Sequence, residues 1–237
     1  LSKPIEASGK LDHTSANRPD FGRPMLLGHF DVDNMVDQGI RLGITFTNAG
    51  STDNSLFWRA DLGSVAAGTP IEISANSDLE WSYQWDPHGG TDLVGALTVN
   101  LNGTTQVIEL TTAQRSSLAA HSLGGFGFLG VAKPDDNESG WYADLFIDDV
   151  TYTQQWNPGL AFEDFTDPSG WSSLGSGVNG NDFGQSDTSH AGGVTGEAGG
   201  RFTRSGHTRY YADTTLTGLD LSKPIEASGK LDHTSAN

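Results

Sequence analysis

The amino-acid sequence predicts an all-β protein, a two-sheet antiparallel sandwich of the jelly-roll kind with one short helix. The chain has 237 residues, of which 31 are Gly, 11 are Phe, 6 are Trp and 5 are Tyr. Glycines suit tight turns, and aromatic residues are enriched in strands. Apolar and polar residues alternate over many short segments, as the two faces of a half-buried strand require. Because two-sheet β proteins reach this length undivided, we expect a single domain over residues 1–237.

Alternation bounded by turn residues places the individual elements. Asn102-Gly103 is typical of a two-residue hairpin turn. One helix is expected over residues 111–120, opened by a Thr cap. Residues 172–200 are rich in Gly, Ser, Asn and Asp, so we expect mostly loop there. Strands are expected at residues 26–32, 40–47, 56–62, 79–85, 95–101, 105–109, 126–131 and 141–153, with a further extended segment at 209–213.

One segment occurs twice. Residues 1–17 and residues 221–237 both have the sequence LSKPIEASGKLDHTSAN, so the sequence repeats after 220 positions (221 minus 1). We call it the duplicated segment, with a first and a second copy. Alternation around Ile5, Ala7 and Leu11 predicts an extended strand that is interrupted at Gly9. Two origins explain such a repeat: a tandem array of near-identical units, or a circularly permuted chain made by design with an overlapping end.

The duplicated segment also predicts how units associate. A domain has one place for such a strand, so we expect the two copies to occupy equivalent positions in successive domains, giving a head-to-tail assembly of neighbouring copies of the chain. Residues 154–159 combine Pro158 and Gly159 and are typical of a linker. We therefore expect the natural start of the unit near residue 160, with the chain folded as one domain in permuted order.

Read cyclically from that point, the unit opens with Phe162-Glu163-Asp164-Phe165 and closes with the segment 145–152, LFIDDVTY. These two segments resemble the first and last strands of concanavalin A-like and laminin-G-like jelly rolls and of several carbohydrate-binding modules. The resemblance implies that an acid from each of these strands shares a structural calcium with backbone carbonyls. On this chain it implies Glu163 and Asp149 as the ligands. The alternative is that both carboxylates face water.

Charge and composition exclude several classes of partner. Thirty acidic residues against 13 basic ones give a net charge of −17, which disfavours nucleic acid and anionic membrane surfaces. The sequence has no apolar stretch of the roughly 20 residues that a membrane-spanning helix needs. Cys is absent, which excludes disulfides and thiolate chemistry. We expect an extracellular or cell-surface location.

No catalytic residue is assigned from the sequence. Retaining glycosidases of the resembled class carry E-x-D-x-x-E on one strand, and this chain lacks that motif. The best enzymatic alternative is a polysaccharide lyase, which requires a base and a group that neutralises the uronate. Because Tyr210 and Tyr211 are adjacent on a strand, they are expected on opposite faces. Lyase candidates are His207, Arg209, Tyr210 and Tyr211, with Trp58, Arg59 and Asp61.

Glycan binding is the other open function. Exposed aromatic rings stack on sugars, and neighbouring polar side chains supply hydrogen bonds. Trp81, Tyr83 and Trp85 fall on one strand face, although such a stripe is more often core. The candidate sugar-contacting residues are Trp85, Asp86, His88, Trp58 and Arg59.

Together these observations favour a non-enzymatic extracellular repeat unit of a tandem or polymeric surface structure, with calcium and polysaccharide as candidate ligands. The alternatives are a carbohydrate-binding module, a polysaccharide lyase, or a designed permutant of such a protein.

Overall fold

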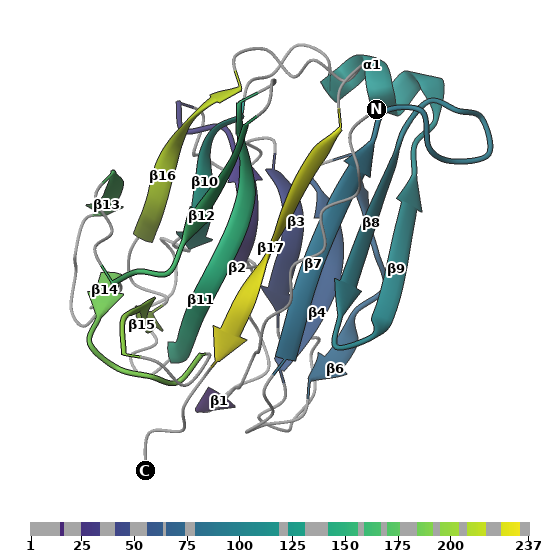
Figure 1. Cartoon of the computed structure of the whole chain (residues 1–237). Helices are drawn as coiled ribbons and strands as arrows, with labels where there is room; N and C mark the ends of the chain where they lie inside the picture. The colour runs from purple at the N-terminus through teal and green to yellow at the C-terminus, as the bar shows by residue number, and fades with distance from the viewer. Residues whose placement is uncertain are drawn as a thin grey trace.

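The computed structural model consists of two antiparallel β-sheets packed face to face, with one short helix at one end (Figure 1). This arrangement confirms the two-sheet sandwich expected from the sequence. The structure describes residues 15–16, 25–33, 41–47, 56–63, 65–73, 79–118, 123–130, 142–155, 159–166, 170–175, 184–191, 195–203, 208–216 and 224–232.

The first sheet, sheet A, has the strand order β14-β15-β11-β17-β7-β8-β9, and β1 and β12 also pair with β11. Every pairing in it is antiparallel. Its strands are β1 (Ser15–Ala16), β7 (Leu79–Asp86), β8 (Ala96–Leu101), β9 (Thr104–Glu109), β11 (Tyr142–Gln155), β12 (Gly159–Glu163), β14 (Gly184–Ser186), β15 (Glu197–Thr203) and β17 (Ile225–Asp232).

The second sheet, sheet B, has the order β13-β16-β10-β2-β3-β4-β5, with β6 paired to β4. Strands from both ends of the sequence enter it, because β16 pairs with β10 and β10 pairs with β2. Its strands are β2 (Met25–Phe30), β3 (Arg41–Thr47), β4 (Leu56–Leu62), β5 (Ala66–Ala67), β6 (Ile71–Ile73), β10 (Leu123–Gly130), β13 (Trp171–Gly175) and β16 (Thr208–Leu216).

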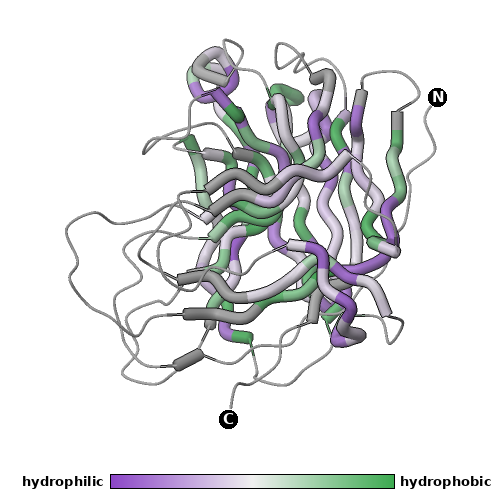
Figure 2. Tube along the Cα trace, turned by 90° about the vertical axis from the view of Figure 1, so that its left-hand side faces the viewer, coloured by the Kyte–Doolittle hydropathy of each residue, from purple (hydrophilic) through white to green (hydrophobic). Residues whose placement is uncertain are grey.

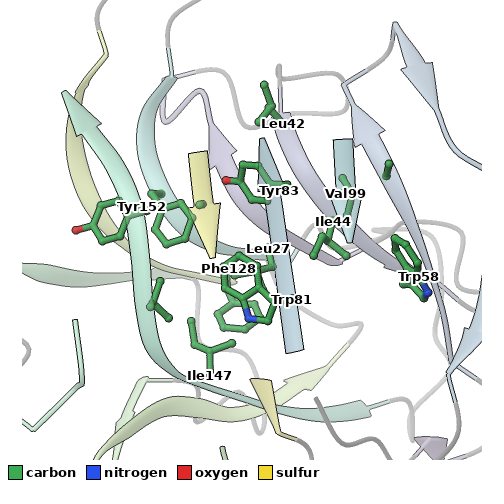
Figure 3. Close-up of a cluster of buried hydrophobic side chains, with 14 of the residues drawn as sticks. Leu27, Leu42, Ile44, Trp58, Trp81, Tyr83, Val99, Phe128, Ile147 and Tyr152 are labelled. Atoms are coloured by element: carbon green, nitrogen blue, oxygen red, sulfur yellow. The ribbon is translucent and has the colours of Figure 1, made fainter. Parts of the chain in front are cut away.

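The main core lies between the two sheets, where the inward side chains of both meet (Figure 3). Strand β7 shows the pattern most clearly: Trp81, Tyr83 and Trp85 are buried, whereas Glu80 and Gln84 on the opposite face are exposed. This alternation is what a strand with one buried face requires. In a view turned by 90° and coloured by hydropathy, hydrophobic (green) and hydrophilic (purple) residues alternate along many of the strands (Figure 2). The core contains residues from nearly every long strand, and Leu27, Ile44, Val99, Phe128 and Ile147 are among those that Figure 3 labels.

The hairpin and the helix follow their sequence signals. Asn102 and Gly103 both have positive φ (47° and 80°) between β8 and β9, as a two-residue type I′ turn requires. Helix α1 (Thr112–Leu118) begins after Thr111, whose hydroxyl accepts a hydrogen bond from the Gln114 backbone N–H at 3.3 Å. The Gln114 side chain in turn accepts one from the Thr111 N–H at 2.8 Å. This reciprocal pair is a capping box.

Residues 172–200, expected to be mostly loop, contain three short strand segments: the end of β13, all of β14 and the start of β15. Strand β15 escapes detection because its sequence, EAGGRFT, lacks alternating apolar residues. Packing explains one of its glycines: a Cβ at Gly199 would overlap the ring of Phe146 on β11. Within the described residues, no helix is long and apolar enough to cross a membrane.

Candidate functional site

The second copy of the duplicated segment supplies β17, the central strand of sheet A (Figure 1, yellow). On one side it pairs with β7, from Ile225 opposite Trp85 to Leu231 opposite Leu79. On the other side it pairs with β11, from Ala227 opposite Tyr152 to Asp232 opposite Phe146. We call this position, between residues 79–85 of β7 and 146–152 of β11, the central slot.

The two faces of β17 are distinct, as the sequence alternation predicts. Ile225 and Ala227 are buried in the core between the sheets, with exposed fractions of 0% and 3%. Glu226 lies on the outward face, where the Gln84 side-chain amide donates a hydrogen bond to its carboxylate at 2.8 Å. The second copy therefore supplies apolar packing on one face and polar pairing on the other. Leu231 belongs to β17, but its side chain lies outside the described residues.

A β-bulge in β11 matches the glycine of the duplicated segment. The register between β11 and β17 shifts between Asp148 and Thr151, so β11 carries one extra residue there. Asp149 has a φ of 51°, and its backbone N–H donates to the Asp148 carboxylate at 2.8 Å. Gly229 lies opposite this bulge: a Cβ on it would come within 2.7 Å of Trp81 and 2.8 Å of Val150. The interruption of the predicted strand by Gly is thus a requirement of the central slot.

A buried polar network joins β17 to both sheets. The Thr153 hydroxyl donates to the Glu226 carbonyl at 2.9 Å and accepts from the Glu226 N–H at 2.8 Å. The Thr153 carbonyl lies 2.7 Å from Nε2 of His29, on β2 in the opposite sheet. Nδ1 of His29 lies 2.7 Å from the Tyr83 hydroxyl on β7. His29 therefore connects sheet B to the two strands that border the central slot.

The environment of His29 selects one protonation state. A carbonyl only accepts hydrogen bonds, so Nε2 carries the proton and Nδ1 accepts from the Tyr83 hydroxyl. Burial lowers the pKa of His29 from 6.5 to about 4, with the hydrogen bond to Thr153 opposing the shift. Burial also raises the pKa of Tyr83 well above its usual value, which keeps its hydroxyl a donor. Both partners are neutral at pH 7.

The end of the first copy lies in register with the second. Strand β1 pairs Ser15 with Ala143 and Ala16 with Tyr142 on β11. Strand β17 pairs Asp232 with Phe146 on the same strand, and each step forward on β17 is one step back on β11. Extended by three residues, that register would bring Ser235 opposite Ala143. Ser235 is the residue of the second copy that corresponds to Ser15, so β1 has the pairing that a longer β17 would have. Residues 1–14 lie outside the described part of the chain.

The residues predicted to contact sugar at the end of β7 have other surroundings. Trp85 is fully buried in the core, so its ring has no face open to a sugar. Asp86 is exposed on the outward side of sheet A, and its carboxylate accepts the His88 backbone N–H at 2.8 Å. That contact closes the turn after β7. Arg115 of α1 holds the same loop through the carbonyls of Pro87 (2.6 Å) and Val94 (2.8 Å).

Trp58 and Arg59 lie on sheet B, so the structure does not bring them together with Asp86 and His88. The Trp58 side chain is 2% exposed and belongs to the core. Arg59 is on the opposite, outward face of β4, where it pairs with Asp61 at 3.7 Å. The Thr45 hydroxyl donates to the same Asp61 oxygen at 3.2 Å. Asp61 itself is fully buried. Arg59 and Asp61 therefore form a partly buried ion pair on the face of sheet B that points away from sheet A.

The two predicted calcium ligands lie on neighbouring strands. Glu163 of β12 is directly opposite Val150, so it is one residue out of step with Asp149. One Glu163 carboxylate oxygen accepts the Phe165 N–H at 3.0 Å. Burial, and to a lesser extent the charge of Glu163, raises the pKa of both Tyr152 and Tyr210 to about 12.

Calcium binds six to eight oxygens, and the described residues contain no group of three or more acidic or His side chains placed to hold a metal ion. The Glu163–Asp149 pair thus supplies only part of a calcium site within the described structure. The calcium expectation remains a prediction.

The lyase candidates are divided by the strand they share. Tyr210 of β16 is in the core at 5% exposure, whereas Tyr211 lies on the other face beside Phe30. The expected opposite orientation of the two tyrosines is confirmed. His207 and the side chain of Arg209 lie outside the described residues.

Sequence reasoning missed His29 and Thr153. A lone His in an apolar strand gives no signal by itself, and its partners are 54 and 124 positions away in the chain. Comparison of the chain with models of protein families, with curated proteins and with solved structures found no match.

Proposed function

We propose that this chain is a non-catalytic structural unit of a tandem or polymeric extracellular assembly, in which each copy of the duplicated segment is the strand that completes one sandwich. The observation that supports the proposal is the position of β17. The only long repeat in the sequence coincides with the central strand of sheet A, rather than with a loop or an edge.

The position of the repeat has a physical consequence. A strand in the middle of a sheet satisfies backbone hydrogen bonds of two neighbours, so a unit that lacks it exposes both β7 and β11. A repeating chain that places this strand at each junction makes the fold of every unit depend on its connection to the next. This dependence would make a surface structure more resistant to mechanical force and proteolysis, because the segment that connects two units is a paired strand and not an exposed linker.

The described residues favour this proposal over a glycan site. Sugar platforms need exposed aromatic faces, and Trp58 and Trp85 are in the core. Among the described side chains, Phe162 is the exposed large aromatic residue, at 63%.

The direct experiment extends the chain by one period, as residues 1–220 followed by residues 1–237. We expect two sandwiches, shown by an unfolding enthalpy about twice that of the single chain, because the enthalpy scales with the number of folded residues. A second period that stays unfolded would contradict the proposal. Binding to a polysaccharide panel at micromolar affinity would favour the carbohydrate-binding alternative instead.

A further inference from the structure

We propose that the central slot is a binding site for the duplicated segment as such, and that it accepts the first copy as well as the second, from the same chain or from another copy of it. The inference deepens the proposed function and rests on the role given there to the segment. Its occupant is defined chemically: an extended strand with the sequence LSKPIEASGKLDHTSAN.

The two copies follow one register on β11. Strand β1 is on the edge of β11 that β17 also occupies, and Ser15 faces the residue that Ser235 would face. Two identical sequences are thus aligned on one template without any offset. Extended backward with the same one-residue shift at the bulge of β11, the first copy would bring Ala7 opposite Tyr152, which is the partner of Ala227.

The first copy carries the same residues through which β17 makes its contacts. The Thr153 hydroxyl pairs with the backbone N–H and carbonyl of Glu226 rather than with its side chain, and the backbone of Glu6 offers the same two groups. Gly9 corresponds to Gly229, which the bulge in β11 requires. Ile5 corresponds to Ile225, whose side chain is fully buried. The slot therefore has no means of distinguishing the copies by sequence.

The order of the strands along the chain is compatible with either copy in the central slot. The chain already runs from β1, on sheet A, to β2, on sheet B. Entry of the first copy into the slot preserves this connection and replaces the strand that follows β16. Only the strand from the other end of the chain must leave.

In a tandem array this choice is collective. Each copy follows one 203-residue body (residues 18 to 220) and precedes the next. Two neighbouring bodies cannot both use the copy between them. All bodies must therefore use the following copy or all the preceding one, except at a defect where one copy is left over. The array thus has two alternative arrangements, one with every body using the following copy and one with every body using the preceding copy, and both make the same contacts.

The first experiment compares Ile5→Ala, Ile225→Ala and the double variant in the full chain. If the central slot must hold the substituted copy, the buried Ile→Ala change should lower the Tm of a protein of this length by on the order of 10 °C. If either copy fills the slot, each single variant keeps an intact strand and its Tm stays within about 2 °C of wild type. Only the double variant shows the full loss. Phe162→Ala, at an exposed position, is the control that should leave Tm unchanged.

The second experiment adds the segment in trans. A fluorescein-labelled peptide of sequence LSKPIEASGKLDHTSAN should bind the double variant saturably and raise its Tm by mass action. The same peptide with Ala in place of Ile should do neither.

Two results would overturn the inference: a single Ile225→Ala variant as unstable as the double variant, or a peptide that neither binds nor stabilises the double variant. Neither result affects the proposed function, because a chain extended by one period would still fold as two units with each second copy in its own slot. Failure of the extended chain, in contrast, would leave peptide binding intact while removing the array.

Discussion

The buried His29 predicts that the protein loses stability between pH 6.5 and pH 4. Its imidazole accepts a hydrogen bond from Tyr83 through Nδ1 and donates one to the Thr153 carbonyl. Protonation of Nδ1 would remove the acceptor and bury a positive charge beside Phe126 (5.0 Å between ring centres). The folded protein therefore resists protonation, whereas the unfolded chain does not.

The direction and the size of this loss of stability follow from the pKa of His29 in the folded and unfolded states. Burial lowers the pKa of His29 to about 4 in the folded state, against 6.5 for the unperturbed group. Between these values the unfolded chain binds more protons, so the free energy of unfolding decreases as pH falls. Above pH 6.5 the stability is complete. By pH 4 the cost is about 3 kcal/mol, since one pKa unit corresponds to about 1.4 kcal/mol.

Urea unfolding of the wild-type protein and of His29→Gln, at pH 7.5 and pH 5, measures this cost. Gln can accept from Tyr83 and donate to Thr153 but does not titrate, and the carboxylates shared by both proteins cancel in the comparison. We expect the wild-type protein to lose about 2 kcal/mol more than the variant over this interval. An NMR titration of the His29 ring in the folded protein gives a second readout, with the ring still neutral at pH 5. Equal pH dependence of the two proteins, or a His29 that titrates near 6.5 while folded, would refute the reasoning.

Two further predictions concern packing and calcium. Gly95→Ala should lower the free energy of unfolding by about 2–5 kcal/mol, because a Cβ there would overlap the Trp85 ring and the φ of 127° is unfavourable for Ala. Gly103→Ala, with nothing within 4 Å of its Cβ, should lower it by about 1 kcal/mol. Equal losses for the two variants in urea unfolding would contradict this account. If Glu163 and Asp149 hold calcium as the resemblance implies, millimolar calcium should raise Tm in the wild-type protein and not in Glu163→Gln; an unchanged wild-type Tm in a calorimetric titration would rule the site out.

The sequence predicted the strands whose two faces differ in polarity. Trp81, Tyr83 and Trp85 alternate with polar residues, and the structure buries all three. The same alternation identified the duplicated segment as a strand and Gly9 as its interruption. What alternation could not reveal was that the equivalent Gly229 faces a bulge in β11, because the bulge depends on a pairing between distant segments.

Glycine-rich strands and buried polar contacts were beyond the reach of the sequence for related reasons. Strand β15 has no apolar alternation, and only the position of Phe146 explains Gly199. The candidate sugar-contacting residues have the residue types that bind sugars, but residue type alone does not show which sheet face each side chain occupies. The fold divides them between two sheets and buries Trp58 and Trp85, because large aromatic side chains stabilise a core more than any other residue. The contacts of His29 likewise exist only once the two sheets meet.

The central claim, that one slot serves two identical strands, can be tested by disulfide trapping. The chain has no Cys, so introduced thiols have no competitors. Ser228 is directly opposite Ser82 in the antiparallel pairing of β17 with β7, and such pairs have Cα separations within the range of a disulfide. Ser8 is the equivalent of Ser228 in the first copy.

The decisive protein carries Ser82→Cys, Ser228→Cys and Ser8→Cys together. After mild oxidation, digestion and mass spectrometry should find position 82 linked to position 228 in some molecules and to position 8 in others. Disulfide-linked dimers on non-reducing gels would show that the strand of one chain occupies the slot of another. Linkage of position 82 to position 228 alone, in a protein that forms no disulfide-linked dimers, would contradict the claim.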